Sequence, residues 1–120
     1  MTDPPEATPP EPAATVLALV RDLMFSGRIS ATARAINAPL RVIRDPAALV
    51  GAQGRRLIVD LNQPGALDAA LAWKAKSAGE VVGFVSHVDA DTIARARAGG
   101  IDRVLPRSQF VTILPELLGS

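Results

Sequence analysis

Short, mainly apolar segments recur along the chain from residue 15 onward. Few polar residues alternate within them, which is typical of strands that are covered on both faces rather than on one. The predicted strands are residues 15–20, 40–43, 56–61, 81–85 and 103–105.

Helical periodicity fills the intervals between these strands. Apolar residues from Phe25 to Ile36 recur at spacings of four, four and three residues, which predicts a helix that ends before Pro39. The remaining helices are predicted at residues 46–50, at residues 67–78, from an N-cap at Asp89 or Asp91 to Ala98, and from an N-cap at Ser108 to Leu118.

Glycine and proline mark the expected ends of these helices. Gly79 would close the third helix as its C-terminal cap, and Gly99-Gly100 would stop the fourth. Pro115 lies inside the last predicted helix, where it would break the hydrogen-bond ladder or start a new turn.

The elements therefore alternate strand and helix five times, with connections of a few residues. Connections of this length build right-handed crossovers and a single parallel sheet. The sequence predicts an α/β fold for residues 15–120, a flavodoxin-like (βα)5 three-layer sandwich around a five-stranded parallel sheet. In such doubly wound sheets, ligands gather at the carboxyl ends of the strands.

Residues 1–14 differ from the rest of the chain in composition. They hold five of the ten prolines, three acidic residues and no basic residue. Because proline fixes φ and lacks an amide proton, we expect a disordered, Pro-rich tail that is partly polyproline-like. An acidic, Pro-rich start is also unlike a secretory signal, so we expect no export.

Composition excludes several classes of protein. The chain has no cysteine and one histidine, His87, which rules out a disulfide scaffold, a thiol nucleophile and a multi-histidine metal site. A net charge of +1 with few aromatic residues argues against a nucleic-acid partner, and no apolar run is long enough to span a membrane. We expect a cytoplasmic protein.

Charged residues gather at the predicted carboxyl ends of two neighbouring strands. Asp22 follows the first strand and Asp60 ends the third, so the two carboxylates should lie close together. Such a pair raises one pKa or recruits a cation such as Mg²⁺. Arg21 precedes Asp22, and its guanidinium would take the place of the metal ion. The alternative is that Arg21 points to solvent and Asp22 caps the first helix.

Two further polar residues are expected at the same edge of the sheet. Ser86 ends the fourth strand and Arg107 follows the fifth. A hydroxyl and a fixed positive charge beside Asp60 would form an arrangement that handles an oxyanion. It could serve phosphoryl transfer onto the carboxylate, or it could be a static salt bridge.

Two motifs resemble the receiver domains of response regulators. Residues 60–65, D-L-N-Q-P-G, resemble the receiver's phosphoacceptor segment, for which the usual wording is D-L-N-M-P-G. Residues 100–105, G-I-D-R-V-L, resemble the G-A-D-D-Y-L segment that leads into the receiver's fifth strand. The resemblance extends from about Thr15 to Leu118.

The resemblance implies roles for individual residues. Asp60 matches the aspartate that accepts phosphate, and Ser86 matches the switch hydroxyl. Asp22 and Asn62 match positions that hold Mg²⁺ together with Asp60, Asn62 through its backbone carbonyl.

The chain departs from the receiver pattern at several positions in this pocket. Arg21 replaces the first acidic residue, Arg107 the lysine, Ser108 the proline after it and His87 a small residue, while the switch aromatic falls at Arg103 or Val104. These departures reverse a charge, crowd the pocket and remove one end of the switch. They indicate that the switch by which receiver domains respond to phosphorylation has been lost or altered in this chain.

We therefore expect a stand-alone, pseudo-receiver-like module of bacterial signal transduction that is not an enzyme and uses no cofactor. It would dock to a regulatory protein or a histidine kinase, or to a second copy, independently of phosphorylation. The resemblance implies docking through the fourth helix, fifth strand and fifth helix, where Arg95, Arg97 and Arg103 would form a basic stripe. Trp73 would pack at the periphery or mark a partner patch.

Two other functions stay open at this point. The first is a working phosphoacceptor of a two-component phosphorelay, with Asp60 as nucleophile and Mg²⁺ held by the acidic pocket. The second is a small-ligand binder or enzyme, which would require a deep apolar pocket at the strand ends.

Overall fold

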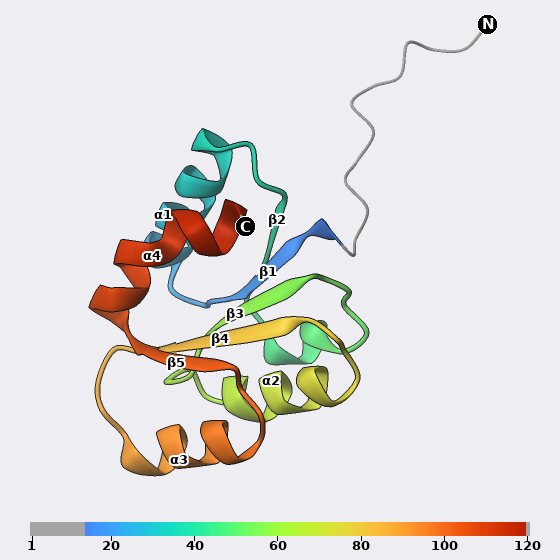
Figure 1. Cartoon of the computed structure of the whole chain (residues 1–120), viewed down its shortest axis with the longest axis vertical. Helices are drawn as coiled ribbons and strands as arrows, with labels where there is room; N and C mark the ends of the chain where they lie inside the picture. Colours follow the sequence, from blue (N-terminus) through green and yellow to red (C-terminus); the bar gives the residue numbers. More distant parts are fainter. Residues whose placement is uncertain (1–13, 120) are drawn as a thin grey trace, which may run out of the picture.

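A five-stranded parallel sheet forms the central layer of the protein, as the computed structural model of the chain shows (Figure 1). The structure describes residues 14–119. The strands are β1 (Val16–Leu19), β2 (Leu40–Ile43), β3 (Arg56–Asp60), β4 (Glu80–Val85) and β5 (Arg103–Pro106). Their order in the sheet is β2-β1-β3-β4-β5, so the chain reverses its direction of winding between β1 and β3. The carboxyl ends of β1 and β3 therefore adjoin, which is where a doubly wound sheet places its ligands.

Two α-helices cover each face of the sheet (Figure 1). One face carries α1 (Leu23–Ala35) and α4 (Arg107–Gly119), and the other carries α2 (Ala66–Ala75) and α3 (Ala90–Ala98). The flavodoxin-like three-layer prediction is confirmed. No helix within residues 14–119 has the length and apolar character that a bilayer crossing requires.

Side chains of β1 alternate between the two cores. Val16 and Ala18 pack under α1 and α4, whereas Leu17 and Leu19 pack on the side of α2. All four residues are fully buried, as the absence of polar alternation predicts. Both faces of the sheet therefore exclude water, and the polar side chains lie at the ends of the strands.

The structure confirms one of the predicted helices in a tighter form and corrects the end of another. The short helix predicted at residues 46–50 is present as a 3-10 helix, η2 (Pro46–Leu49), with Asp45 as its N-cap, and the described residues also hold four α-helices. The helix α2 ends at Ala75 with Lys76 as its C-cap, and Gly79 lies beyond it, immediately before β4. Glycine is required at position 79 by packing, because an added Cβ would lie 2.6 Å from the indole of Trp73.

The last helix also differs from the prediction. It begins at Arg107, directly after β5, so Ser108 lies inside its first turn instead of capping it. The helix continues through Pro115 to Gly119. Proline removes only one hydrogen bond, and burial of Leu114, Leu117 and Leu118 on either side of it favours the helix.

The predicted Pro-rich tail lies outside the described residues, apart from Ala14. The fold begins where Thr15 enters the sheet, and the backbone oxygen of Thr15 accepts a hydrogen bond from the N–H of Arg55 at 2.9 Å.

Candidate functional site

Asp60 is the partly buried carboxylate at the carboxyl end of β3. Burial raises its pKa most strongly, while the N–H of Asn62 and the positive charge of Arg107 lower it. The neighbouring charge of Asp22 raises it further. The N–H of Asn62 donates to Asp60 Oδ1 at 3.0 Å. The balance is a carboxylate with a raised pKa, chiefly because burial disfavours its charged form.

Asp22 is the N-cap of α1. Its Oδ1 accepts hydrogen bonds from the N–H of Met24 at 2.9 Å and the N–H of Phe25 at 3.2 Å. These bonds satisfy two of the four N–H groups that have no partner at the start of a helix. The alternative prediction, in which Asp22 caps the first helix, is therefore confirmed.

Arg21 does not form the ion pair that we expected with Asp22 or Asp60. Its side chain is exposed, and none of the salt bridges among residues 14–119 involves it. A guanidinium in water gains little from a surface ion pair, so solvent competes successfully with the carboxylates. The backbone N–H of Arg21 is held by Gln63 Oε1 at 3.0 Å.

Arg107 is the cation that does face the acidic edge. Its charge lowers the pKa of Asp60, but its guanidinium carbon lies 3.9 Å from the ring centroid of Phe25. A planar, weakly hydrated guanidinium stacks well on an aromatic face, whereas a compact ammonium group is more strongly hydrated. Arg107 is therefore held by the ring at the start of α1 and forms no salt bridge with a residue of the described range.

Asn62 links the ends of β3 and β4 through its side chain. Its Oδ1 accepts hydrogen bonds from the N–H of Ser86 at 2.7 Å and the N–H of His87 at 3.3 Å. We call these two bonds the Asn62 bridge. Any other acceptor at this edge, such as a phosphoryl oxygen, would compete with Asn62 for the same donors.

Gln63 is a structural residue of the site that the sequence analysis missed. Its side chain is buried, and its Nε2 donates to the backbone oxygen of Arg44 at 2.9 Å while its Oε1 accepts from Arg21. The loops that follow β1, β2 and β3 are thereby tied together. A signal was present, because Gln63 stands where the receiver motif usually has an apolar methionine.

The acids at this edge form a sparse donor set for a metal ion. Within the described part of the chain, no three His, Cys, Asp or Glu residues come together as a metal site. One oxygen of Asp22 and one of Asp60 already accept backbone N–H groups. Mg²⁺ can bind through two carboxylates and water. Asp22, Asp60 and the carbonyl of Asn62 would be its protein ligands here, with water filling the rest of the shell.

A hollow of about 380 Å³ lies beside the acidic edge, between α3, β5 and the start of α4. We call it the strand-end hollow. It is lined by residues 85–88, Ile93, Arg97 and residues 104–108. Of the predicted site residues it brings together Ser86, Arg97 and Arg107, and its rim carries Val88, an apolar residue that is 83% exposed.

Two of the three arginines in the predicted basic stripe lie close to carboxylates. Arg95 pairs with Asp68 of α2 at 2.7 Å, and Arg103 lies 3.7 Å from Glu80 at the other end of the sheet. Of the three arginines, only Arg97 lines the strand-end hollow. The positions of these arginines in the sequence did not predict which carboxylate each side chain would contact.

The sequence matches no protein-family model and no curated protein. Solved structures do match. The phosphorylated cyanobacterial phytochrome response regulator RcpA superposes with a TM-score of 0.73 at 12% identity, over 87% of this chain and 90% of that one. The chain has the receiver fold. A response regulator receiver protein from Pseudoalteromonas atlantica (TM-score 0.72, 9% identity, 85% and 91% of the chains) and chemotaxis protein CheY4 from Vibrio cholerae (0.70, 18%, 88% and 99%) are also similar.

The receiver fold fixes where Asp60, Ser86 and Arg107 lie, but not what they do. At identities of 9% and 18% the similarity concerns the backbone. The chemistry of the site must be argued from its own side chains.

Proposed function

We propose that the chain is a receiver-like signalling module of the cytoplasm that acts by docking to another protein and does not depend on phosphorylation of Asp60. The observation that carries the proposal is the position of Arg107. Its guanidinium stacks on Phe25 at 3.9 Å instead of pairing with Asp60. A phosphoryl group on Asp60 would bring about two negative charges, which require positive charge and hydrogen-bond donors around them.

The other groups that could receive this charge have partners or face water. The N–H groups of Ser86 and His87 are occupied by the Asn62 bridge. Both hydrogen bonds are exposed, so a phosphoryl oxygen would have to displace Asn62 Oδ1 to reach these donors. Arg21 is exposed to solvent and forms no salt bridge within residues 14–119. Each step toward a phosphorylated state therefore begins by breaking an existing contact or ordering an exposed side chain.

The strand-end hollow is the docking surface that this function would use. Val88 and Ile93 supply apolar area, and Arg97 supplies a positive charge that pairs with no carboxylate of the described residues. A partner with an apolar anchor beside an acidic residue fits this surface. A regulatory protein, a histidine kinase or a second copy of the chain could present such an anchor.

A second candidate function is that of a working phosphoacceptor. It is favoured by the exposed position of Arg21, which leaves Asp60 and Asp22 unblocked on that side. Similar structures include the phosphorylated RcpA and a Burkholderia pseudomallei response regulator with a phosphorylated aspartic acid and a calcium ion. In this function Asp60 would be the nucleophile, and Asp22 and Asn62 would help it to hold Mg²⁺.

Phosphorylation can be measured directly. The protein is incubated with acetyl phosphate and Mg²⁺, and its intact mass is recorded beside that of Asp60→Asn. We expect no mass gain in the wild-type chain. The double variant Arg21→Asp/Arg107→Lys restores the acidic residue and the lysine of the receiver pattern, and we expect it to gain one phosphoryl group. A gain in the wild-type chain that is lost in Asp60→Asn would establish the second candidate instead.

Docking can be tested with a matched pair of variants. Val88 is 83% exposed beside the strand-end hollow, and Met24 is 87% exposed at the start of α1. We expect Val88→Asp to lose a partner that wild-type protein captures from a lysate, and Met24→Asp to retain it. Equal capture by both variants would contradict this docking surface.

A further inference from the structure

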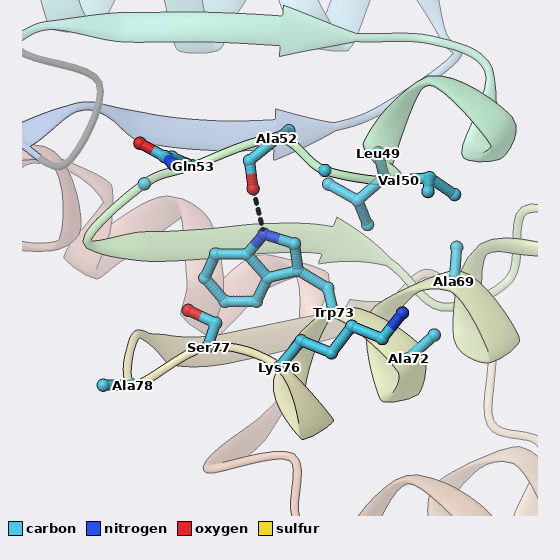
Figure 2. A pocket seen from close by; sticks show the side chains of 12 residues that line it. Leu49, Val50, Ala52, Gln53, Ala69, Ala72, Trp73, Lys76, Ser77 and Ala78 are labelled. Carbon is cyan, nitrogen blue, oxygen red and sulfur yellow. Dashed lines mark hydrogen bonds between the residues drawn. The ribbon is translucent and has the colours of Figure 1, made fainter.

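A second groove lies on the α2 side of the sheet, between the loop after η2 and α2 (Figure 2). Its volume is about 470 Å³. We call it the Trp73 groove. It is lined by residues 49–54, Ala69, Ala72, Trp73 and residues 76–78.

Trp73 forms the rigid part of this groove. The indole N–H donates to the backbone oxygen of Ala52 at 2.8 Å, and the residue is only 6% exposed (Figure 2). Trp73 belongs to the hydrophobic core, so the expectation that it packs at the periphery was wrong. The ring is held in place before any partner arrives, which lowers the entropy that binding would cost.

The rest of the groove is apolar with one positive charge. Val50 is 80% exposed at the rim, where nothing in the fold accounts for a large apolar side chain in water. Lys76 is the single charged residue in the lining, and it forms no salt bridge with another residue of 14–119. The groove therefore suits an apolar segment that carries negative charge.

The N-terminal segment of this chain has that chemistry. Residues 2–13, T-D-P-P-E-A-T-P-P-E-P-A, contain five prolines, three acidic residues and no basic residue. Proline-rich segments favour the polyproline II conformation and bind in grooves lined by aromatic side chains, because little conformational entropy is left to lose.

The segment also joins the fold at the rim of the groove. Gly54 lines the groove, and an added Cβ on Gly54 would lie 2.8 Å from the backbone oxygen of Thr15. Residues 49–54 span at most about 20 Å when extended. Nine residues of polyproline II, 5–13, span about 28 Å. The segment is therefore long enough to follow the whole groove from its point of attachment.

We propose that residues 2–13 dock in the Trp73 groove of the same molecule, with prolines against Trp73 and Val50 and an acidic side chain near Lys76. Attachment beside the groove gives the segment a millimolar effective concentration, so a weak contact is sufficient. Docking would cover a surface that shares no lining residue with the strand-end hollow, and it is independent of the function proposed above.

A spin label tests the proposal in the full-length chain. The protein has no cysteine, so Ala7→Cys provides a unique site for a nitroxide. We expect the amide signals of Val50, Ala72 and Lys76 to lose most of their intensity, and those of α1 on the other face to keep theirs. Uniform broadening, or none, would overturn the proposal.

Two matched variants locate the contact. Ala72 on α2 and Ala31 on α1 are both exposed helical alanines. We expect Ala72→Glu to abolish the broadening by steric clash and repulsion of the acidic segment, and Ala31→Glu to leave it unchanged. Lys76→Glu should weaken it as well. Broadening that survives both Ala72→Glu and Lys76→Glu would overturn the proposal.

A mixing experiment distinguishes the same chain from a second copy. Isotope-labelled protein without the nitroxide is mixed with unlabelled protein that carries it. We expect no broadening in the mixture. Broadening as strong as in the protein that carries both the isotope and the nitroxide would show that the segment binds another copy. The intramolecular proposal would then be wrong.

Discussion

A double-mutant cycle between Arg107 and Phe25 measures what holds the Arg107 guanidinium. The guanidinium carbon lies 3.9 Å from the centroid of the Phe25 ring, and Phe25 is 2% exposed. A cation over an aromatic face stabilises by about 0.5–1 kcal/mol at an exposed site and by about 2 kcal/mol when desolvated. Because Arg107 is partly buried, we expect a coupling free energy of about 1 kcal/mol.

The single variants have their own expected costs. Phe25→Leu removes ring contacts with Phe84 and Phe110, whose centroids lie 5.1 and 5.9 Å away. Each aromatic pair contributes about 0.5–1.5 kcal/mol beyond the area that it buries, so we expect a loss of roughly 1–3 kcal/mol. Arg107→Met keeps the aliphatic stem and removes the charge, so its cost should be close to the coupling itself.

Urea unfolding gives the four free energies of the cycle. Trp73 is the single tryptophan of the chain, and its fluorescence can be followed together with far-UV circular dichroism. A second cycle pairs Arg107→Met with Asp60→Asn. We expect the Phe25 cycle to give the larger coupling. A coupling near zero with Phe25 and a larger one with Asp60 would place the cation in the acidic pocket, which would contradict a phosphorylation-independent module.

Three further predictions concern the site and the core. Burial raises the pKa of Asp60, so the ionised form costs stability at neutral pH. Asp60→Asn should raise the free energy of unfolding at pH 7, and the gain should disappear below the unfolded-state pKa of about 4, as urea titrations at several pH values will show. Gly83→Ala should cost about 1–3 kcal/mol in the same assay, because the added Cβ would lie 2.5 Å from Leu61, which is buried. Trp73→Phe leaves the backbone oxygen of Ala52 without its donor and should lower the thermal midpoint, with a loss of about 1–3 kcal/mol.

The sheet could be predicted from the sequence because burial on both faces is a local property. Residues 40–43 and the other apolar runs have few polar positions, and short crossovers restrict how parallel strands can be ordered. The helix ends were harder to predict. Gly79 has the residue type of a C-cap, but its small size is required by Trp73, which packs against it from the helix before it. Contacts of this kind are set by the tertiary structure and leave no periodic signal.

The position of the site could be predicted from the sequence, but the contacts between its side chains could not. The neighbouring ends of β1 and β3 bring Asp22 and Asp60 to one edge, as the strand order requires. Which partner a long side chain finds depends on distances of a few ångströms and on competition with water. The sequence therefore left open whether Arg21 pairs with the acids or faces solvent, and the structure shows that it faces solvent. The stacking of Arg107 on Phe25 was not predicted.

The polar groups around Asp60 have their hydrogen bonds and contacts with other residues of the fold. Gln63 holds two neighbouring loops, Asn62 takes the N–H groups at the end of β4, and Arg107 rests on an aromatic ring. Across residues 14–119 no buried side-chain nitrogen or oxygen lacks a hydrogen-bond partner. A site that must accept a charged group needs donors directed at the place where that charge will arrive. In this protein the donors and the cation stabilise one arrangement of the strand ends, and the docking surface that we propose beside them requires such a stable arrangement.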